Sequence, residues 1–177
     1  MKDFSSYENS DRPLADEGEY ELVLKIERGQ TKDGNKDYLN LDFKIRNDVD
    51  QKHKDDNIHI FDKAWRDTTD PEWYDCKKLG KILYTQKNKK DFKAGFDEQD
   101  ELTQYLNGIH LVAYIEKKYD DYYQREVNSI KYLSYKPSAW DVAHPEAAAK
   151  PVEDAPVTNE AADKLVDGAG TDDPCPF

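Results

Sequence analysis

The chain has little cysteine and no long apolar run, and each shortage excludes a class of protein. Its two cysteines, Cys76 and Cys175, lie far apart and show no CxxC or His/Cys spacing of a zinc site. We therefore expect two free thiols in a reducing compartment. No apolar stretch approaches the roughly 20 residues that a membrane span needs, and the first residues lack the hydrophobic segment of a signal peptide. These absences predict a soluble intracellular protein.

Catalytic signals are equally scarce. Only four histidines are present, and there is no serine nucleophile motif and no glycine-rich phosphate loop. Acidic residues are abundant, but abundance alone defines no acid/base pair. The sequence therefore predicts a protein that is not an enzyme, with no cofactor and no metal.

Apolar residues are concentrated in one part of the chain, since hydrophobic residues make up 37% of the sequence and charged residues 36%. Residues 18–136 are rich in Leu, Ile, Val, Tyr, Phe and Trp, which predicts one folded domain. Residues 1–17 read as a polar lead-in. Residues 137–177 are rich in Ala, Pro, Glu, Asp, Val and Thr without periodicity, which is typical of a disordered tail.

The pattern inside the domain favours a mainly β fold. Apolar residues alternate with polar ones over 18–28 and most regularly over 38–47, as in half-buried antiparallel strands. Shorter strands are expected at 58–61, 109–119 and 123–135. A helix is expected from Asp70 as N-cap and Pro71 as first residue through 87, and a second short one over 100–107. This order predicts a five-stranded OB-fold (oligonucleotide-binding) barrel with a helix between strands three and four.

The charge of the chain argues against a nucleic-acid binder unless its bases gather on one face. The net charge is −12, and residues 137–177 hold nine acids and two bases, which gives −7. The remaining 24 bases and 29 acids leave the rest of the chain at −5. An acidic balance also suits an acidic protein-interaction module or a DNA mimic that inhibits a host nucleic-acid enzyme.

Aromatic residues interleaved with bases nevertheless occur in two places, and a sequence-tolerant groove for single strands requires this combination. One is the outward face of the strand at 38–47, and the other is the hairpin at 117–125. The candidates for stacking on bases are Tyr38, Trp65, Tyr119, Tyr122 and Tyr123, with His59 and Phe61 as additions. The candidates for phosphate contact are Lys44, Arg46, Lys117, Lys118, Arg125 and Lys131.

Each candidate set has a plainer interpretation. The strand face could be an ordinary solvated surface, and one or two of the hairpin tyrosines could cover the end of the barrel. The turn at 28–36 carries bases and is a weak candidate for a clamp on DNA. The lysines in and after the expected helix, from Lys77 to Lys93, most simply form a solvated face.

The end of the chain is the most specific motif. Acids lead into Pro-Phe in the sequence Asp172, Asp173, Pro174, Cys175, Pro176 and Phe177. This element resembles the C-terminal tip of bacterial single-stranded-DNA-binding proteins, with Cys175 where an aliphatic residue usually stands and Pro174 in place of an acid. A terminal Phe can enter an apolar pocket while its carboxylate pairs with a base, so we expect these six residues to bind partner proteins.

The segment 37–48, DYLNLDFKIRND, also looks like a bacteriophage family of unassigned function that is associated with single-stranded-DNA binding. The resemblance implies binding and protection of single-stranded DNA during phage replication and recombination. It places the protein in the cytoplasm of an infected bacterial host and its partners among phage or host replication and recombination proteins. Oligomeric state stays open, a homo-oligomer included.

Overall fold

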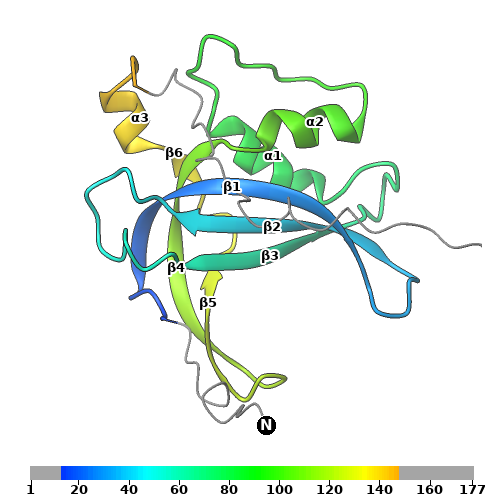
Figure 1. Ribbon diagram of the computed structural model, residues 1–177. Helices are drawn as coiled ribbons and strands as arrows, with labels where there is room; N and C mark the ends of the chain where they lie inside the picture. Colours follow the sequence, from blue (N-terminus) through cyan, green and yellow to red (C-terminus); the bar gives the residue numbers. More distant parts are fainter. Residues whose placement is uncertain (1–12, 148–177) are drawn as a thin grey trace, which may run out of the picture.

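The computed structural model describes residues 13–147, and Figure 1 shows a curved sheet with three helices beside it. The strands are β1 (Gly18–Gln30), β2 (Asp37–Ile45), β3 (His59–Trp65), β4 (His110–Asp120), β5 (Arg125–Ile130) and β6 (Lys136–Pro137). The helices are α1 (Cys76–Tyr84), α2 (Gln99–Leu106) and α3 (Ala139–Ala143). The expected mainly β fold with short helices is confirmed.

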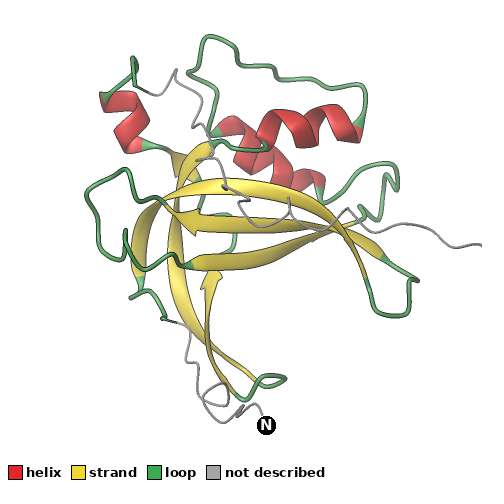
Figure 2. Cartoon of the chain, in the orientation of Figure 1, coloured by secondary structure: helices red, strands yellow, loops and turns green. Residues whose placement is uncertain are grey.

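The strands form one antiparallel sheet in the order β3-β2-β1-β4-β5, with β6 added to β4. The long strand β1 lies at the centre and pairs with β2 along Leu22–Gln30 and with β4 along Gly18–Val23. The sheet curls, so that β3 and β5 lie next to each other (Figure 2). Within the described residues, no hydrogen-bonded ladder joins these two strands, and the sheet is not a closed barrel.

The alternating pattern of the sequence decides which side of the sheet is the core. Tyr20, Leu22, Leu24 and Ile26 of β1 and Leu39, Leu41, Phe43 and Ile45 of β2 are all buried. The residues between them on β2 are only half-buried. Since successive side chains of a strand point to opposite faces, these two strands separate an apolar interior from a polar outer face.

Two helices cover one end of the sheet. Leu79, Ile82 and Leu83 of α1 and Leu102 and Leu106 of α2 join the core. The β4–β5 hairpin lies at the opposite end of the molecule, as Figure 1 shows. None of the helices within residues 13–147 is long and apolar enough to cross a membrane.

The N-cap of helix α1 lies five residues later in the chain than the expected N-cap, Asp70, because another carboxylate holds the first turn of the helix. Asp75 accepts a hydrogen bond from Lys78 N at 3.0 Å and is the N-cap. Asp67 meanwhile accepts from the backbone of Thr69 and Cys76, and this holds the preceding residues in a turn. The prediction of a helix beginning at Pro71 is therefore wrong.

Two strands also differ in length from the sequence prediction. β3 continues four residues beyond Phe61 to Trp65. β5 ends at Ile130 and does not run to Tyr135, whose ring instead packs on Phe43 with centroids 5.8 Å apart. The half-buried ring of Tyr135 therefore packs against the core.

The folded part of the chain extends past the predicted boundary at residue 136. Ser138 caps α3 by accepting a hydrogen bond from Asp141 N at 3.0 Å. Asp141 itself is buried. Helix α3 thus packs against the sheet through Ser138 and Asp141, whereas the expected disorder of 148–177 lies outside the described residues.

A lysine of α1 lies against the outer edge of β3. Lys78 Nζ donates hydrogen bonds to the backbone oxygen of Lys63 and to Asp62 Oδ2, both at 2.8 Å. Asp75 N likewise donates to Trp65 O at 2.9 Å. These bonds fix the start of α1 along that edge.

Candidate nucleic-acid interface

Four rings line the outer face of β2 and β3. The register places Tyr38 opposite Trp65, Asp42 opposite Phe61, and Lys44 opposite His59. The ring centroids of Tyr38 and Trp65 are 5.1 Å apart, and those of His59 and Phe61 are 6.1 Å apart. We call Tyr38, His59, Phe61 and Trp65 the aromatic strip. It follows β2 from Tyr38 to Lys44, about 20 Å at the usual rise of a strand.

The rings of the strip are available to solvent. Phe61 is 52% exposed and Trp65 is 42% exposed. Exposed large rings on one strand face are unusual unless they meet a partner, because burying each would be favourable. The strip is therefore a candidate binding surface.

A glycine makes room for one of these rings. Gly29 of β1 lies opposite Tyr38, and a Cβ built on Gly29 would be 2.6 Å from Tyr38 Cε2. No side chain fits at that distance, so the glycine allows the Tyr38 ring to lie over β1.

Cations accompany the strip. Lys63 Nζ lies 4.4 Å from the centre of the Tyr38 ring and 5.5 Å from that of Trp65. Asp42 is the acid among these residues, and His59 Nδ1 lies 2.9 Å from its Oδ1. Aromatic rings for bases and ammonium groups for phosphates thus occur together on β2 and β3.

The Tyr38 end of the strip is braced by an ion pair. Arg66 Nη2 lies 2.7 Å from Asp37 Oδ2, and Tyr74 also donates its hydroxyl hydrogen to Asp37. Hydrogen bonds from Arg66 and Tyr74 lower the pKa of Asp37 to about 2. Asp37 is therefore charged at neutral pH and holds the starts of β2 and α1 together.

A groove opens at the other end of the strip. It has a volume of about 540 Å³. Lys44, His59 and His110 line it from the sheet, and Lys89 and Asn107 line it from the loops that follow α1 and α2. Lysine side chains line the groove from the sheet and from the loop after α1, and the carboxylates of Asp42 and Asp48 line it as well.

The structure overturns one predicted contact, because Arg46 is only 2% exposed. Arg46 N donates to Glu21 O, which continues the β1–β2 pairing one residue beyond Ile45. The side chain therefore lies on the outer face of the sheet, and α3 covers it there. The guanidinium pairs with Asp141 at 2.9 Å and with Asp48 at 2.7 Å, and it lies over the Trp140 ring. Arg46 fixes α3 to the sheet and does not face solvent.

Asp141 is the centre of this buried cluster. Its carboxylate also lies 3.0 Å from His110 Nδ1. Burial favours the neutral acid, but hydrogen bonds from His110 and Arg46 outweigh it and hold the pKa of Asp141 well below its ordinary value. The cluster is charged at neutral pH and attaches the last described segment of the chain beside the groove.

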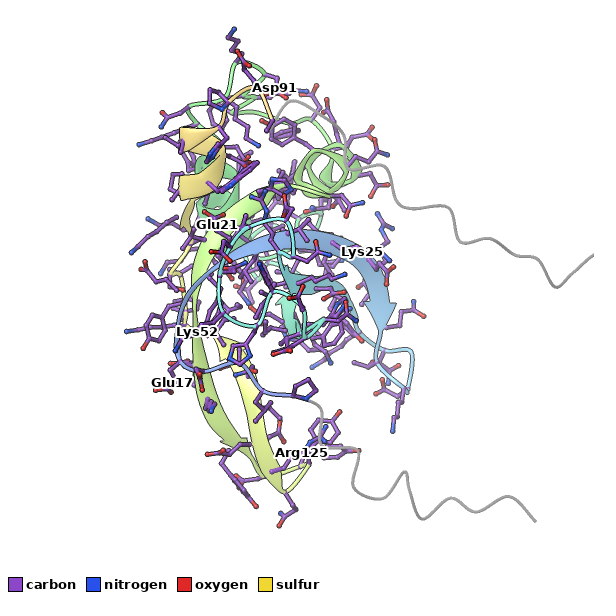
Figure 3. The ribbon with its side chains drawn as sticks, turned by 60° about the vertical axis from the view of Figure 1, so that its left-hand side comes forward. Glu17, Glu21, Lys25, Lys52, Asp91 and Arg125 are labelled. Carbon is purple, nitrogen blue, oxygen red and sulfur yellow. The ribbon has the colours of Figure 1, made fainter. Side chains whose placement is uncertain are left out.

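The hairpin candidates form a second group, away from the strip. Tyr119, Tyr122 and Tyr123 are all exposed, and the rings of Tyr122 and Tyr123 meet edge to face with centroids 5.0 Å apart. Arg125 lies 5.7 Å from the centre of the Tyr123 ring. Figure 3 shows Arg125 at one end of the molecule and Asp91 at the other, with Lys25 between them.

The three remaining lysine candidates have partners of their own. Lys118 pairs with Glu116 at 2.5 Å, and Lys117 lies 3.7 Å from Asp16. Lys131 lies over the ring of Tyr114 at 5.4 Å. Among the described residues, no ring contact joins the hairpin group to the aromatic strip.

The sequence predicted no role for Gly29 or Lys63, and it placed Lys89 in a solvated face. For Lys63 a signal was present: His59, Phe61, Lys63 and Trp65 alternate with Ile60 and Ala64, but the strand was ended at Phe61. Gly29 and Lys89 depend on which strands and loops become neighbours, which no local pattern reveals. The partner-binding candidates Asp172 to Phe177 lie outside the described residues.

Among residues 13–147, no group of three or more His, Cys, Asp or Glu side chains could hold a metal ion. The chain matches the family described as "Protein of unknown function (DUF669)" over residues 2–149, which is most of its length. No curated protein matches it.

Proposed function

The chain belongs to the DUF669 family, and from that premise we propose that it is a non-catalytic protein that binds and protects single-stranded DNA during bacteriophage replication and recombination. The aromatic strip is the observation that carries this proposal. Rings on which successive bases stack contribute roughly 1–3 kcal/mol each and tolerate any sequence. Lys63 and Lys44 stand beside the rings, where phosphates would lie.

The proposal includes an OB fold, and the strand connections support it. The order β3-β2-β1-β4-β5 brings β3 beside β5, and α1 follows β3 in the chain. A five-stranded, partly open barrel has this arrangement, and it binds oligonucleotides on the face of its second and third strands. The aromatic strip occupies that face.

The acidity of the whole chain, −12, does not oppose binding at the strip. The acids near the strip have partners of their own, because Asp42 Oδ1 lies 2.9 Å from His59 Nδ1 and Glu27 of β1 pairs with Lys25 at 2.7 Å. Few phosphates would be neutralised here, so stacking should dominate the affinity. Each phosphate contact adds about 0.7 to the salt slope for single strands, and we expect a shallow slope.

We place recruitment of other replication and recombination proteins at the tip, Asp172 to Phe177. The sequence supports it, because acids followed by Pro-Phe suit a basic, apolar pocket on a partner. The hairpin residues Lys117 to Arg125 and Lys131 remain secondary candidates for DNA contact.

Titration of fluorescently labelled poly-dT at low salt tests the function. Phe61→Ala and Trp65→Ala should each weaken binding by about 5- to 150-fold, the loss of one stacked base. Tyr132→Ala is the matched control, because Tyr132 is 64% exposed and lies in the turn after β5, outside the strip. Equal affinities for the strip variants and the unaltered protein would show that the strip does not bind DNA.

The rival function is an acidic module or DNA mimic that inhibits a host nucleic-acid enzyme, and the net charge of −12 favours it. The same titration separates the two. No binding to poly-dT at low salt, together with tight binding to a basic protein, would support the mimic.

A further inference from the structure

The helical end of the molecule carries a strongly basic segment in an otherwise acidic chain. Residues 76–93 contain seven lysines and a single acid, Asp91. The segment comprises α1 and the first part of the connection to α2. A local excess of six positive charges within a molecule of net charge −12 is large enough to attract a polyanion.

Part of this charge is already used inside the protein. Lys78 is buried against Asp62, Lys93 pairs with Glu101, and Lys77 lies over the Tyr132 ring. Lys81, Lys87 and Lys90 are exposed and make no ion pair within residues 13–147. Their charges remain available to a ligand.

The connection that carries Lys87 to Lys90 is held firmly. Gln86 Nε2 donates to His110 O at 2.9 Å, and Lys89 N donates to Gln86 O at 2.9 Å. The ring of Phe92 packs on the core and lies 5.9 Å from the Tyr84 ring. We call Lys87, Lys89 and Lys90 the lysine turn. Its position relative to the sheet is fixed by β4.

The lysine turn borders the groove at the end of the aromatic strip. Lys89 lines the groove together with Lys44 and His59, and its ammonium group lies 3.8 Å from Asp141 Oδ2. Lys63, Lys44 and Lys89 therefore lead from the strip through the groove to the turn. Charge complementarity and this continuity both favour a nucleic-acid strand as the occupant.

We infer that a single strand bound on the aromatic strip continues through the groove and over the lysine turn, which contacts its phosphates. This inference rests on the proposed function and extends its site to a second, purely electrostatic part. The strip supplies stacking, and the turn supplies most of the salt dependence. Binding should therefore strengthen with strand length after the strip is full.

The test compares dT oligonucleotides of about 5 and about 15 nucleotides, within the range of site sizes of OB folds. The double variant Lys87→Gln, Lys90→Gln should bind the short oligonucleotide with the same affinity as the unaltered protein. The unaltered protein should bind the long oligonucleotide more tightly than the short one, and the double variant should lose this gain. The steepness with which its affinity for the long oligonucleotide falls with salt should decrease by about 1.4, which corresponds to two phosphate contacts. Thermal unfolding of the variant checks that the fold is unchanged.

The control is Lys52→Gln with Lys54→Gln, which removes the same formal charge from the β2–β3 loop and touches no residue of the groove. An equal loss in this control would mean that only net charge matters. A normal length gain and slope in the lysine-turn variant would overturn the inference while leaving the proposed function in place. No binding of either oligonucleotide by the unaltered protein would overturn both.

One outcome would identify a different occupant. If the effect of the double variant disappeared in a chain ending at Ala147, the lysine turn would be a site for the acidic residues 148–177. That result would also overturn the inference.

Discussion

The Tyr38 ring occupies the space that a side chain at position 29 would fill, so the aromatic strip depends on a glycine there. Gly29→Ala would place a methyl group 2.6 Å from the Tyr38 ring and push the ring off β1. We expect weaker binding of poly-dT, by up to the roughly 1–3 kcal/mol of one stacked base, because Tyr38 leaves its position beside Trp65. Fluorescence titration measures the change.

Gly80→Ala is the control for this substitution. Nothing lies within 4 Å of a Cβ at Gly80, and the residue is in α1. Alanine there should stabilise the helix by about 1 kcal/mol and leave DNA affinity unchanged. Equal DNA affinity for Gly29→Ala and the unaltered protein would refute the role of Tyr38.

Asp141 makes stability depend on acid pH. Its pKa is lower in the folded chain than in the unfolded one, so its contribution is complete above the unfolded value of about 3.9 and is lost as pH falls toward the folded value. Asp141→Asn should lower the free energy of unfolding by about 3 kcal/mol at pH 7. The loss is at the low end for a buried ion pair because Arg46 still pairs with Asp48.

Urea unfolding at pH 7 and below pH 4 measures this. The difference between Asp141→Asn and the unaltered protein should shrink as pH falls below about 4, because the Asp141 carboxylate then takes up a proton in the unfolded chain but not in the folded one. Asp91→Asn, an exposed acid, serves as the control and should be neutral at both. If the difference in unfolding free energy between the two proteins did not change with pH, Asp141 would not contribute to stability through its charge.

At the scale of single residues, the sequence predicted the outward direction of Tyr38, Lys44 and Phe61, because alternation along a strand determines it. It failed for the exposure of Arg46, because α3 covers this side chain on the outer face and supplies Asp141, 95 positions away. Contacts over such separations leave no local pattern.

At the scale of elements, the start of α1 gives a direct test. Asp75 caps the helix, and Asp70, the residue that the sequence favoured, accepts only a backbone bond from Trp73 N. Asp75→Ala should destabilise the protein by about 0.5–2 kcal/mol, and Asp70→Ala by less than about 0.5 kcal/mol. Chemical denaturation of the two variants distinguishes them. The reverse order would mean that the helix begins earlier in solution.

The element types and their order were predictable, whereas several ends were not. β3 was cut short because Asp62 interrupts the apolar pattern, although Lys78 pairs with that carboxylate. β5 was extended because Tyr132 and Tyr135 resemble strand residues, although Tyr135 fills the core beside Phe43. In both places a partner from another element decided the outcome.

At the scale of the whole molecule, the acidic C-terminal region should compete with DNA. Residues 148–177 hold seven acids and two bases, a net charge of −5 before the terminal carboxylate. Because this segment is tethered close to cationic groups, its removal should tighten DNA binding at low salt. A chain ending at Ala147 should show the gain, and titrations at low and high salt measure it. Equal affinities at low salt would exclude the competition.

The position of that truncation matters. Removal of all residues from 137, the boundary that composition suggests, would also remove α3 and leave Arg46 buried without Asp141. Such a chain should lose stability, and its DNA affinity would then report unfolding as well as competition. Thermal unfolding of the two truncated chains separates these effects.

The bond from Lys78 to Lys63 O has a consequence for association between copies of the chain. Since Ile45 N donates to Ile58 O, residues 59, 61, 63 and 65 direct their backbone groups away from β2. An exposed row of this kind is a template for edge-to-edge strand addition and aggregation. Lys78 and Asp75 occupy two of its four carbonyl groups, at Lys63 and Trp65. The segment that starts α1 thus also leaves two fewer carbonyl groups on this edge for strand addition, while the rings of Phe61 and Trp65 stay exposed on the outer face of the sheet.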